Sequence, residues 1–414
     1  MTIIIDGTVG ANKAVVLDSS GKLPAIDGSL VTTLNATQVT TGSIATARLD
    51  TGTTTGKVLV LDGSGNMPAI AAGAMTGVSS ATKSSSDPTV STNPSTGLGT
   101  KWINTTSGEI YILTDATAGA NVWTSTGGTS GDVVPWFYGG TQYGYSAGGY
   151  PSNDLIDKFS FTSDGNASDI GNLTIARHAV CGNSSKTYGF ACGGSPTMNT
   201  IDKYSFSVDG NAVDHGDLSV ARTYPTEPGS SSSTHGYTAG GSSGNVIDKF
   251  LFASNSNASD VGNLTSGRGS SYGHSSTTHG YAAHNAIIDK WAFASDGDAA
   301  DVGALSTSAA QAGAGTSSAT YGYSSGAEPY SGAHGNVIDK YSFASAGTAT
   351  DVGNLVAGRG NCVGQSSTTY GYTSGGDGGG NHDIIDKFSF TADGNATDVG
   401  NLITARGYMG GSHY

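Results

Sequence analysis

The hexapeptide Ile156-Asp157-Lys158-Phe159-Ser160-Phe161 recurs through the C-terminal part of the sequence. Every copy has Ile-Asp-Lys, then an aromatic residue, a small residue or leucine, and phenylalanine. The copies begin at Ile156, Ile201, Ile247, Ile288, Ile338 and Ile385, so neighbouring copies are 41 to 50 residues apart. Six copies at this spacing indicate a repeat architecture, in which each repeat is one supersecondary unit.

Each repeat divides into four segments of strand length that are separated by turn signals. In the third repeat we predict strands at 222–230, 235–241, 246–254 and 258–265. Serine-rich stretches, Gly-Gly and Asp-Gly-Asn supply the turns. Four strands in roughly 46 residues is the size of one propeller blade. A single blade cannot bury both of its faces, but neighbours on both sides cover them.

The composition also favours β-structure with many tight turns. Of the 414 residues, 65 are glycine and only 12% are charged. Glu occurs three times, so strong helix formers are scarce and a helical protein is excluded. Glycine shows no period of three and only 10 residues are proline, which excludes collagen. Aromatic residues recur at fixed places in the repeat, which is not the pattern of a disordered chain.

The repeats resemble kelch repeats over roughly residues 136 to 414. The shared features are Gly-Gly at the end of the second strand, an aromatic residue in the third, and Arg at the start of the next first strand. The resemblance implies a six-bladed kelch-like β-propeller, which we assign to residues 133–414. A solenoid of six stacked units is the alternative.

The sequence departs from the kelch pattern at two places. Asp260-Val261-Gly262-Asn263-Leu264 stands where kelch repeats have a tryptophan in the fourth strand. The fourth repeat has Ala282-Ala283-His284 in place of Gly-Gly, and Ser308 in place of Arg. Blade packing is therefore expected to differ in detail from that of kelch proteins.

Two segments compete for the first strand of the first blade. One is Trp136-Phe137-Tyr138-Gly139-Gly140, and the other is the C-terminal stretch 406–414. We expect the C-terminal stretch to fill this place, because it would join the ends of the ring and remove an open sheet edge.

The N-terminal third has a different repeat. Residues 14–34 and 58–78 are similar to each other at an offset of 44. They resemble the shaft repeats of bacteriophage tail fibres, which are typically intertwined trimers. Each segment has few apolar residues, and three chains around one axis would bury them together. We therefore assign residues 1–81 to an extended trimeric shaft with attachment repeats.

A small β module and a linker are predicted at 82–132. Residues 99–104 and 108–112 form the arms of a hairpin around 105–108. Similar modules occur in phage tail-fibre proteins. Trp102, Tyr111 and Trp123 could present a sugar platform, but we favour a small hydrophobic core.

Most motifs that suggest chemistry are better explained by the repeat. The Asp of Ile-Asp-Lys and the Arg that ends most repeats are expected to pair between strands. The Asp-Gly-Asn segments suggest Ca²⁺, but the copies lose charge in the third and fifth repeats, as expected for turns. No two of the nine His residues have metal-ligand spacing. Cys181 and Cys192 are expected to face each other in one hairpin, as buried free thiols or, less favoured, as a disulfide.

Enzymatic activity has little support. The carboxylates free of a repeated role are Glu227, Glu328, Asp154, Asp377 and Asp383, and glycan cleavage needs a pair at one cleft. We therefore expect neither an enzyme nor a metal or cofactor site. The net charge of −14 argues against nucleic acid, and no apolar run is long enough to insert into a membrane.

The face that carries the loops between the second and third strands is the expected binding face. In an up-and-down blade these loops lie on the same face as those from the fourth strand to the next first strand. They vary most among the repeats, and loops on a rigid scaffold are where function concentrates. The alternative is that they are merely solvated. The candidate receptor-binding residues are Tyr150, Asn153, Tyr330, His334, His382 and Asp383.

Similar Ile-Asp-Lys-Phe-Ser-Phe repeats occur in bacteriophage structural proteins, and the resemblance implies an exposed virion fibre or spike. The expected function is adhesion to a host-cell glycan or protein by a homotrimer whose N-terminus contacts other virion proteins. A structural neck, capsid or tail decoration and a capsule-degrading depolymerase are the alternatives. From Trp136 onward there are 23 acidic and 12 basic residues, which disfavours strongly anionic glycans.

Overall fold

The computed structural model describes residues 19, 81–126, 138–242, 244–307, 312–328 and 334–414, and every regular element in them is a β-strand. The expected all-β class is confirmed. The shaft assigned to 1–81 lies outside the described residues, apart from Ser19 and Ala81. The chain divides into two compact units, Met1–Asp87 with Gly99–Ile112 and Pro88–Leu98 with Leu113–Tyr414.

The strands before residue 126 form a small four-stranded sheet. Its order is β1 (Thr82–Ser84), β2 (Lys101–Asn104), β3 (Ile110–Asp115) and β4 (Val122–Ser125). The hairpin predicted around 105–108 is confirmed, because β2 and β3 pair antiparallel. Tyr111 and Trp123 are fully buried, as expected of core residues, while Trp102 is partly buried and its indole N–H donates to the Ser86 carbonyl at 2.9 Å.

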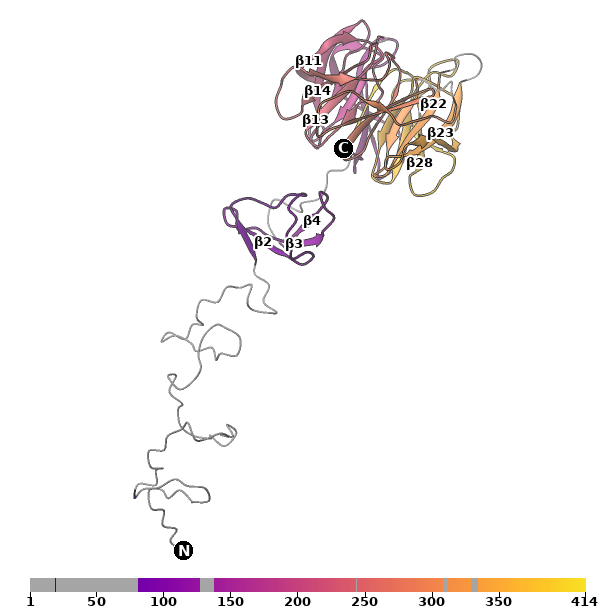
Figure 1. The fold of residues 1–414 in the computed structure, drawn as a ribbon. Helices are drawn as coiled ribbons and strands as arrows, with labels where there is room; N and C mark the ends of the chain where they lie inside the picture. Colours follow the sequence, from indigo (N-terminus) through magenta and orange to yellow (C-terminus); the bar gives the residue numbers. More distant parts are fainter. Residues whose placement is uncertain (1–18, 20–80, 127–137, 243, 308–311, 329–333) are drawn as a thin grey trace. The chain divides into compact units, whose positions relative to one another are not determined.

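From residue 143 on, the described strands form six four-stranded sheets, one for each repeat, which we call sheets 1 to 6 (Figure 1). The strands are given in their order within each sheet. Sheet 1 is β30 (Gly410–His413), β5 (Tyr143–Ala147), β6 (Asn153–Ser160) and β7 (Ser168–Arg177). Sheet 2 is β8 (Cys181–Ser184), β9 (Tyr188–Cys192), β10 (Met198–Ser205) and β11 (Val213–Arg222). Sheet 3 is β12 (Ser230–Ser231), β13 (His235–Ala239), β14 (Val246–Leu251) and β15 (Ser259–Asn263).

The remaining sheets repeat this order. Sheet 4 is β16 (Tyr272–Ser275), β17 (His279–His284), β18 (Ile287–Ala292) and β19 (Ala300–Asp301). Sheet 5 is β21 (Ala314–Ser317), β22 (Tyr321–Ala327), β23 (Gly335–Ser342) and β25 (Thr350–Asn354). Sheet 6 is β26 (Val363–Ser366), β27 (Tyr370–Ser374), β28 (Ile384–Ser389) and β29 (Thr397–Asn401). A short parallel pair, β20 (Gly303–Ala304) with β24 (Gly347–Thr348), links the outer parts of sheets 4 and 5.

The C-terminal strand completes sheet 1, as expected. β30 pairs antiparallel with β5, from Gly410 opposite Ala147 to His413 opposite Gly144. The Tyr414 carbonyl then accepts the N–H groups of residues 141, 142 and 143 at 2.8, 2.6 and 3.0 Å. The competing segment has another role, because the Tyr138 side chain is buried and donates its hydroxyl to the Gly229 carbonyl at 3.2 Å.

The first strand predicted at 222–230 is wrong in its extent. Arg222 ends β11 of sheet 2, and the first strand of sheet 3 is only Ser230–Ser231. Tyr224 has a left-handed backbone with φ of 54°, and Pro225 and Pro228 have no N–H to donate to a strand pair. The chain therefore turns before it can form the strand.

The first strands of the six sheets contact one another in cyclic order, from β8 through β12, β16, β21 and β26 to β30 and back to β8. A cycle of hydrogen bonds joins their ends. Each backbone N–H donates to the side chain of the equivalent residue in the next strand, at 2.9 to 3.3 Å. The members of this serine–histidine ring are Ser184, Ser231, Ser275, Ser317, Ser366 and His413, whose N–H returns to Ser184.

Backbones approach so closely inside this ring of strands that a side chain does not fit. A Cβ atom at Gly182 would collide with the backbone of Gly411, and one at Gly364 would collide with the backbone of Gly315. Glycine at these positions is therefore a requirement of close strand packing. In the neighbouring hairpin Cys181 lies opposite Cys192, and both are buried free thiols.

Ion pairs join consecutive sheets through the Ile-Asp-Lys aspartates, as expected of structural pairing. The five pairs, with N···O distances of 2.5 to 3.0 Å, are Arg177–Asp202, Arg222–Asp248, Arg268–Asp289, Arg359–Asp386 and Arg406–Asp157. The last pair joins sheet 6 to sheet 1. Asp339 of sheet 5 has no arginine partner among the described residues and accepts the Ser306 N–H at 2.9 Å. All of these aspartates are buried.

Aromatic rings stack across the same boundaries. A ring on the second strand of one sheet lies on the final phenylalanine of the hexapeptide in the next sheet, with centroids 4.7 to 5.0 Å apart. The pairs are Tyr145–Phe206, Phe190–Phe252, Tyr237–Phe293, Tyr281–Phe343, Tyr323–Phe390 and Tyr372–Phe161. Each sheet therefore buries its faces against two neighbours, and the sixth contacts the first.

Removal of one arginine should show how much a sheet boundary depends on its ion pair. We expect Arg359→Ala to lower the free energy of unfolding by about 3–5 kcal/mol, because Asp386 would be left buried without its cation. Asp339→Asn is the matched control, since Asp339 lacks an arginine, and it should change stability by no more than about 1 kcal/mol. Urea unfolding of both variants measures this, and equal losses would contradict the assigned role of the pair.

Candidate functional site

One end of the six sheets carries both variable loop types. The Tyr150 N–H donates to the Gly407 carbonyl at 2.8 Å, the Ser195 N–H to His178 at 2.7 Å, and the Asp377 N–H to Gly360 at 2.8 Å. Each bond joins a loop between second and third strands to a segment that enters a first strand. The expectation that these two loop types share a face is therefore confirmed at these places.

A second cycle of hydrogen bonds lies at this end, just before the first strands. Its six residues are Ala179, Tyr224, Ser270, Ala312, Asn361 and Tyr408, all with φ between 52° and 59°. The N–H of each residue donates to the carbonyl of the one before, and the Ala179 N–H closes the cycle on the Tyr408 carbonyl. The Asn361 N–H donates to the Ala312 carbonyl, and the other five bonds are 2.7 to 3.3 Å long. We call these six residues the rim.

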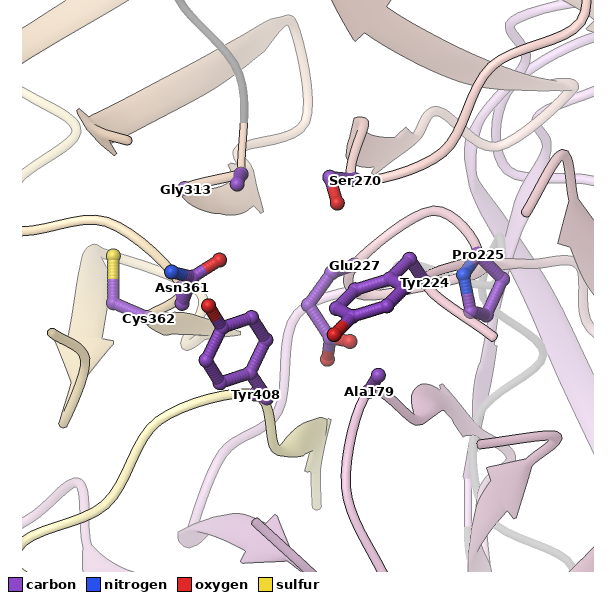
Figure 2. A pocket seen from close by; sticks show the side chains of 10 residues that line it. Ala179, Tyr224, Pro225, Glu227, Ser270, Gly313, Asn361, Cys362 and Tyr408 are labelled. Atoms are coloured by element: carbon purple, nitrogen blue, oxygen red, sulfur yellow. The ribbon is translucent and has the colours of Figure 1, made fainter. Parts of the chain in front are cut away.

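A concave site lies inside the rim. Its outer part is a depression of about 430 Å³, which falls within the usual range for ligand pockets. Its lining residues include Tyr224, Ser270, Ala312, Asn361 and Tyr408 of the rim, with Arg268, His284 and Glu328 beside them. The same five rim residues also line a smaller cavity of about 20 Å³ with Glu227 and Cys362. We call the two parts together the pit, and Figure 2 shows the side chains of the smaller part around one space.

Aromatic side chains form one wall of the pit. The rings of Tyr224 and Tyr408 lie 5.7 Å apart at 73°. Tyr408 also contacts Tyr150 and His178, at 6.2 and 6.1 Å between centroids, and Tyr150 lies 5.2 Å from His178. Burial raises the pKa of Tyr408 to about 12, so its hydroxyl remains a hydrogen-bond donor at neutral pH. An exposed aromatic surface therefore runs from the predicted residue Tyr150 into the pit.

Glu227 lines the smaller part of the pit together with Tyr224 and Tyr408 (Figure 2). One of its carboxyl oxygens accepts the Gly411 N–H at 3.3 Å. Desolvation raises the pKa of Glu227 well above its ordinary value, against the opposing effect of the Gly411 bond. A neutral carboxylic acid both donates and accepts hydrogen bonds. The Glu227 carboxyl therefore retains hydrogen-bonding capacity for a ligand inside the pit.

The fourth, degenerate repeat contributes part of the pit wall, and polar atoms there have no hydrogen-bond partner in the described part of the chain. In Arg177, Arg359 and Arg406 the Nε–H donates to a glycine carbonyl, at 2.8 to 2.9 Å. Arg268 Nε is buried with no such partner in the described part of the chain. His284 takes the place of the first glycine of the Gly-Gly pair, and its Nδ1 is also buried without a partner in that part. Desolvation and Arg268 lower the pKa of His284, so the imidazole is neutral at pH 7.

The predicted receptor-binding residues are distributed unevenly around this site. Tyr150 is half exposed, and its carbonyl accepts the Asn381 side-chain amide at 3.3 Å. Asn153 begins β6, and its Oδ1 accepts the Leu155 N–H at 2.7 Å. His334 Nδ1 lies 3.4 Å from Glu328 Oε2, a carboxylate that lines the pit.

His382 and Asp383 lie in the loop before β28. Their carbonyls accept the N–H groups of Arg406 and Leu402 at 3.1 and 2.7 Å, so their backbones hold the segment beyond β29. Tyr330 lies outside the described residues. Of the predicted set, Tyr150 is in ring contact with a rim residue, and His334 approaches a lining carboxylate.

The rim is a functional feature that the predicted strands and loops do not include. Five rim residues lie two positions after an arginine, and the sixth, Ala312, occupies the equivalent turn. Their side chains vary among the repeats, with alanine and tyrosine twice each and serine and asparagine once each. The divergence used to select the loops between second and third strands also applied to these positions. The strand predicted at 222–230 places Tyr224 and Glu227 inside regular structure and so conceals these positions.

A different depression, of about 370 Å³, is lined by Tyr321, Lys340, Asp393 and neighbouring residues. Its polar groups are already engaged in repeated contacts, because Lys340 Nζ lies 2.8 Å from Asp393 and 4.6 Å from the Tyr321 ring centroid. Equivalent lysine–aspartate pairs occur at other sheet boundaries, such as Lys158–Asp209. This depression is therefore a gap between repeats rather than a site.

No protein-family model matches the sequence, and no curated protein is significantly similar to it. Within the described ranges, no group of three or more His, Cys, Asp or Glu side chains is arranged to hold a metal ion. The same ranges contain no helix with the length and hydropathy to cross a membrane.

The carboxyl of Glu227 should make stability depend on pH. Its pKa is raised on folding, so the folded state holds the proton more tightly than the unfolded state. Stability from this group is therefore present below about pH 4 and is lost as pH rises, by at most about 1.4 kcal/mol per pH unit. We expect the free energy of unfolding of Glu227→Gln, relative to the parent, to increase between pH 4 and 7.

Urea unfolding at several pH values measures this difference. Glu227→Ala is the companion variant, because it removes the same carboxyl but also its packing. It should show the same trend with pH at a lower overall stability. A difference that stays constant with pH in both variants would show that Glu227 ionises normally in the folded protein.

Proposed function

We propose that the chain is an exposed fibre or spike component of a bacteriophage virion and that it adheres to a host-cell surface through a glycan or protein receptor. The observation that carries the adhesion proposal is the pit, an open site with aromatic and polar walls to which several repeats contribute. The virion assignment depends on the resemblance of the hexapeptide repeats and of 14–34 and 58–78 to phage proteins.

In this proposal the six sheets are the blades of a closed β-propeller. Four kinds of contact support closure, because each continues from sheet 6 to sheet 1. They are the serine–histidine ring, the rim, the arginine–aspartate pairs and the stacked aromatic rings. A solenoid of six units would have two free ends, and it would lack all four kinds of contact between sheet 6 and sheet 1. Residues 1–81 are proposed to form the trimeric shaft, and its N-terminus to bind other virion proteins.

Hydrolysis of a host polysaccharide is the weaker alternative. Glycoside hydrolysis commonly needs one protonated and one ionised carboxyl group across the bond that is cleaved. The two glutamates that line the pit, Glu227 and Glu328, both have raised pKa values, in each case chiefly through desolvation. The same effect therefore acts on both carboxyls, and no contrast between their environments marks one as the acid and the other as the base. A purely structural decoration would not need an open polar pit.

Adhesion can be tested with the fluorescently labelled full-length chain and a panel of bacterial strains. We expect saturable binding to at least one strain and its loss after mild periodate oxidation of the cell-surface glycans. Protease treatment of the cells is the parallel arm that identifies a protein receptor. Shortening of the purified surface polysaccharide during incubation would support the depolymerase, and absence of binding to every strain would support a structural decoration.

Assembly gives a separate prediction. In sedimentation equilibrium the full chain should have three times the mass of one protomer, because the shaft segments bury their few apolar residues only together. A fragment of residues 133–414 should be a folded monomer. A monomeric full chain, or an unfolded fragment, would contradict the proposed division between shaft and propeller.

A further inference from the structure

We propose that the pit binds the terminal residue of an uncharged saccharide, with the sugar ring against Tyr224 and Tyr408 and its hydroxyls bonded to Glu227, Asn361 and the Arg268–His284 wall. That this sugar belongs to a host glycan rests on the proposed function. Binding of the free sugar does not depend on it.

The base of the pit is closed, which selects a chain end. Tyr138 occupies the space between the first strands on the side away from the rim, where its carbonyl accepts His413 Nε2 at 2.6 Å and its ring lies 4.4 Å from the His413 ring. Its hydroxyl reaches the Gly229 carbonyl at the start of sheet 3. A ligand can therefore enter from the rim but cannot pass through, so the end of a saccharide chain is the part that reaches the groups at the base.

The charges of the pit select an uncharged ligand. The guanidinium of Arg268 lies 2.6 Å from Asp289, so its charge is already paired. Burial raises the pKa values of Glu227 and Glu328 and lowers that of His284. Apart from Arg268, the pit lining contains no lysine or arginine. A carboxylated, sulfated or phosphorylated sugar would be desolvated here without an opposite charge.

The geometry of the polar and aromatic groups fits a sugar better than an apolar ligand. Tyr224 is more than one-third exposed, and its ring and the Tyr408 ring offer apolar surface with hydroxyls at the edge. The Asn361 amide donates to Glu328 Oε2 at 3.0 Å, which fixes its orientation. A pyranose likewise combines an apolar face with hydroxyls around its edge.

The break in the repeat pattern supplies an independent reason. The fourth repeat has lost Gly-Gly, and this is the wall where Arg268 Nε and His284 Nδ1 are buried without partners in the described residues. An unsatisfied buried polar atom costs free energy, and the intact Gly-Gly repeats avoid the cost at the arginine. Both residues line the pit, so hydroxyl groups of a bound sugar would give these atoms partners, as glycine carbonyls do for the arginine in intact repeats.

The test uses the full-length chain and saturation-transfer NMR with isothermal titration. The neutral probes are the methyl glycosides of glucose, galactose, mannose, rhamnose and N-acetylglucosamine, and the charged probes are N-acetylneuraminic acid and glucuronic acid. We expect at least one neutral probe to bind and the charged probes to give no signal. Tyr408→Ala and Glu227→Ala should each weaken that binding at least tenfold.

His284→Gly restores the repeat pattern and is the most specific variant. It should weaken sugar binding at least threefold while thermal stability stays equal or rises. Tyr370→Ala is the matched control, because Tyr370 is a similarly exposed tyrosine that carries Lys387 over its ring at 4.8 Å and does not line the pit. It should leave the affinity unchanged.

The outcomes separate this inference from the proposed function. Neutral sugars that bind the parent and Tyr408→Ala equally, binding of charged probes only, or no binding of any probe would each overturn the pit as a site for uncharged sugar, even if labelled protein adheres to cells. Sugar binding that the pit variants abolish, in a protein that adheres to no strain, would support the site and overturn the adhesin.

Discussion

A buried aspartate that is satisfied across a sheet boundary is the interaction on which the rest of this structure depends. Asp202 is fully buried and accepts the Thr174 N–H and hydroxyl at 2.9 and 2.6 Å as well as the Arg177 guanidinium, all from the preceding repeat. An ionised carboxyl cannot be buried without such partners. No repeat contains the partners of its own aspartate, so each one is stable only beside its predecessor. Arg406 extends the rule from the last repeat to Asp157 of the first.

The rim also joins each repeat to its neighbour, but its hydrogen bonds do not involve its side chains. Its cycle is made by backbone N–H and carbonyl groups, so any side chain that tolerates a left-handed backbone can stand there. Elsewhere the ring of contacts fixes the residue type, as glycine at Gly364 or serine at Ser275. The scaffold therefore tolerates different side chains at the rim positions. This tolerance allows a repetitive fold to carry one asymmetric site.

The sequence was sufficient for the parts of the fold that every repeat shows. The hexapeptide, Gly-Gly and Asp-Gly-Asn predicted all-β structure with four strands per repeat, and the spare C-terminal segment predicted the strand that completes sheet 1. The candidate site could not be predicted in the same way. It lies where the repeats differ, and it depends on contacts between residues that are far apart in the sequence. Tyr138 was considered as a strand residue, but its contact with His413 depends on which chain end enters sheet 1. Tyr408 and Tyr224 are 184 positions apart, and no local pattern brings their rings together.

The position of Tyr138 also has a mechanical consequence. Tyr138 contacts His413 of the serine–histidine ring, while the pit opens at the other end of the first strands. A tension applied between a ligand in the pit and the chain at Tyr138 therefore acts along the first strands. Hydrogen bonds of an antiparallel pair are perpendicular to the strands, so such a load shears many of them together instead of opening them one by one. The bonds of the Tyr414 carbonyl to residues 141–143 fasten the residue after β30 at the loaded point, so pulling does not peel β30 from its sheet before the other bonds share the force.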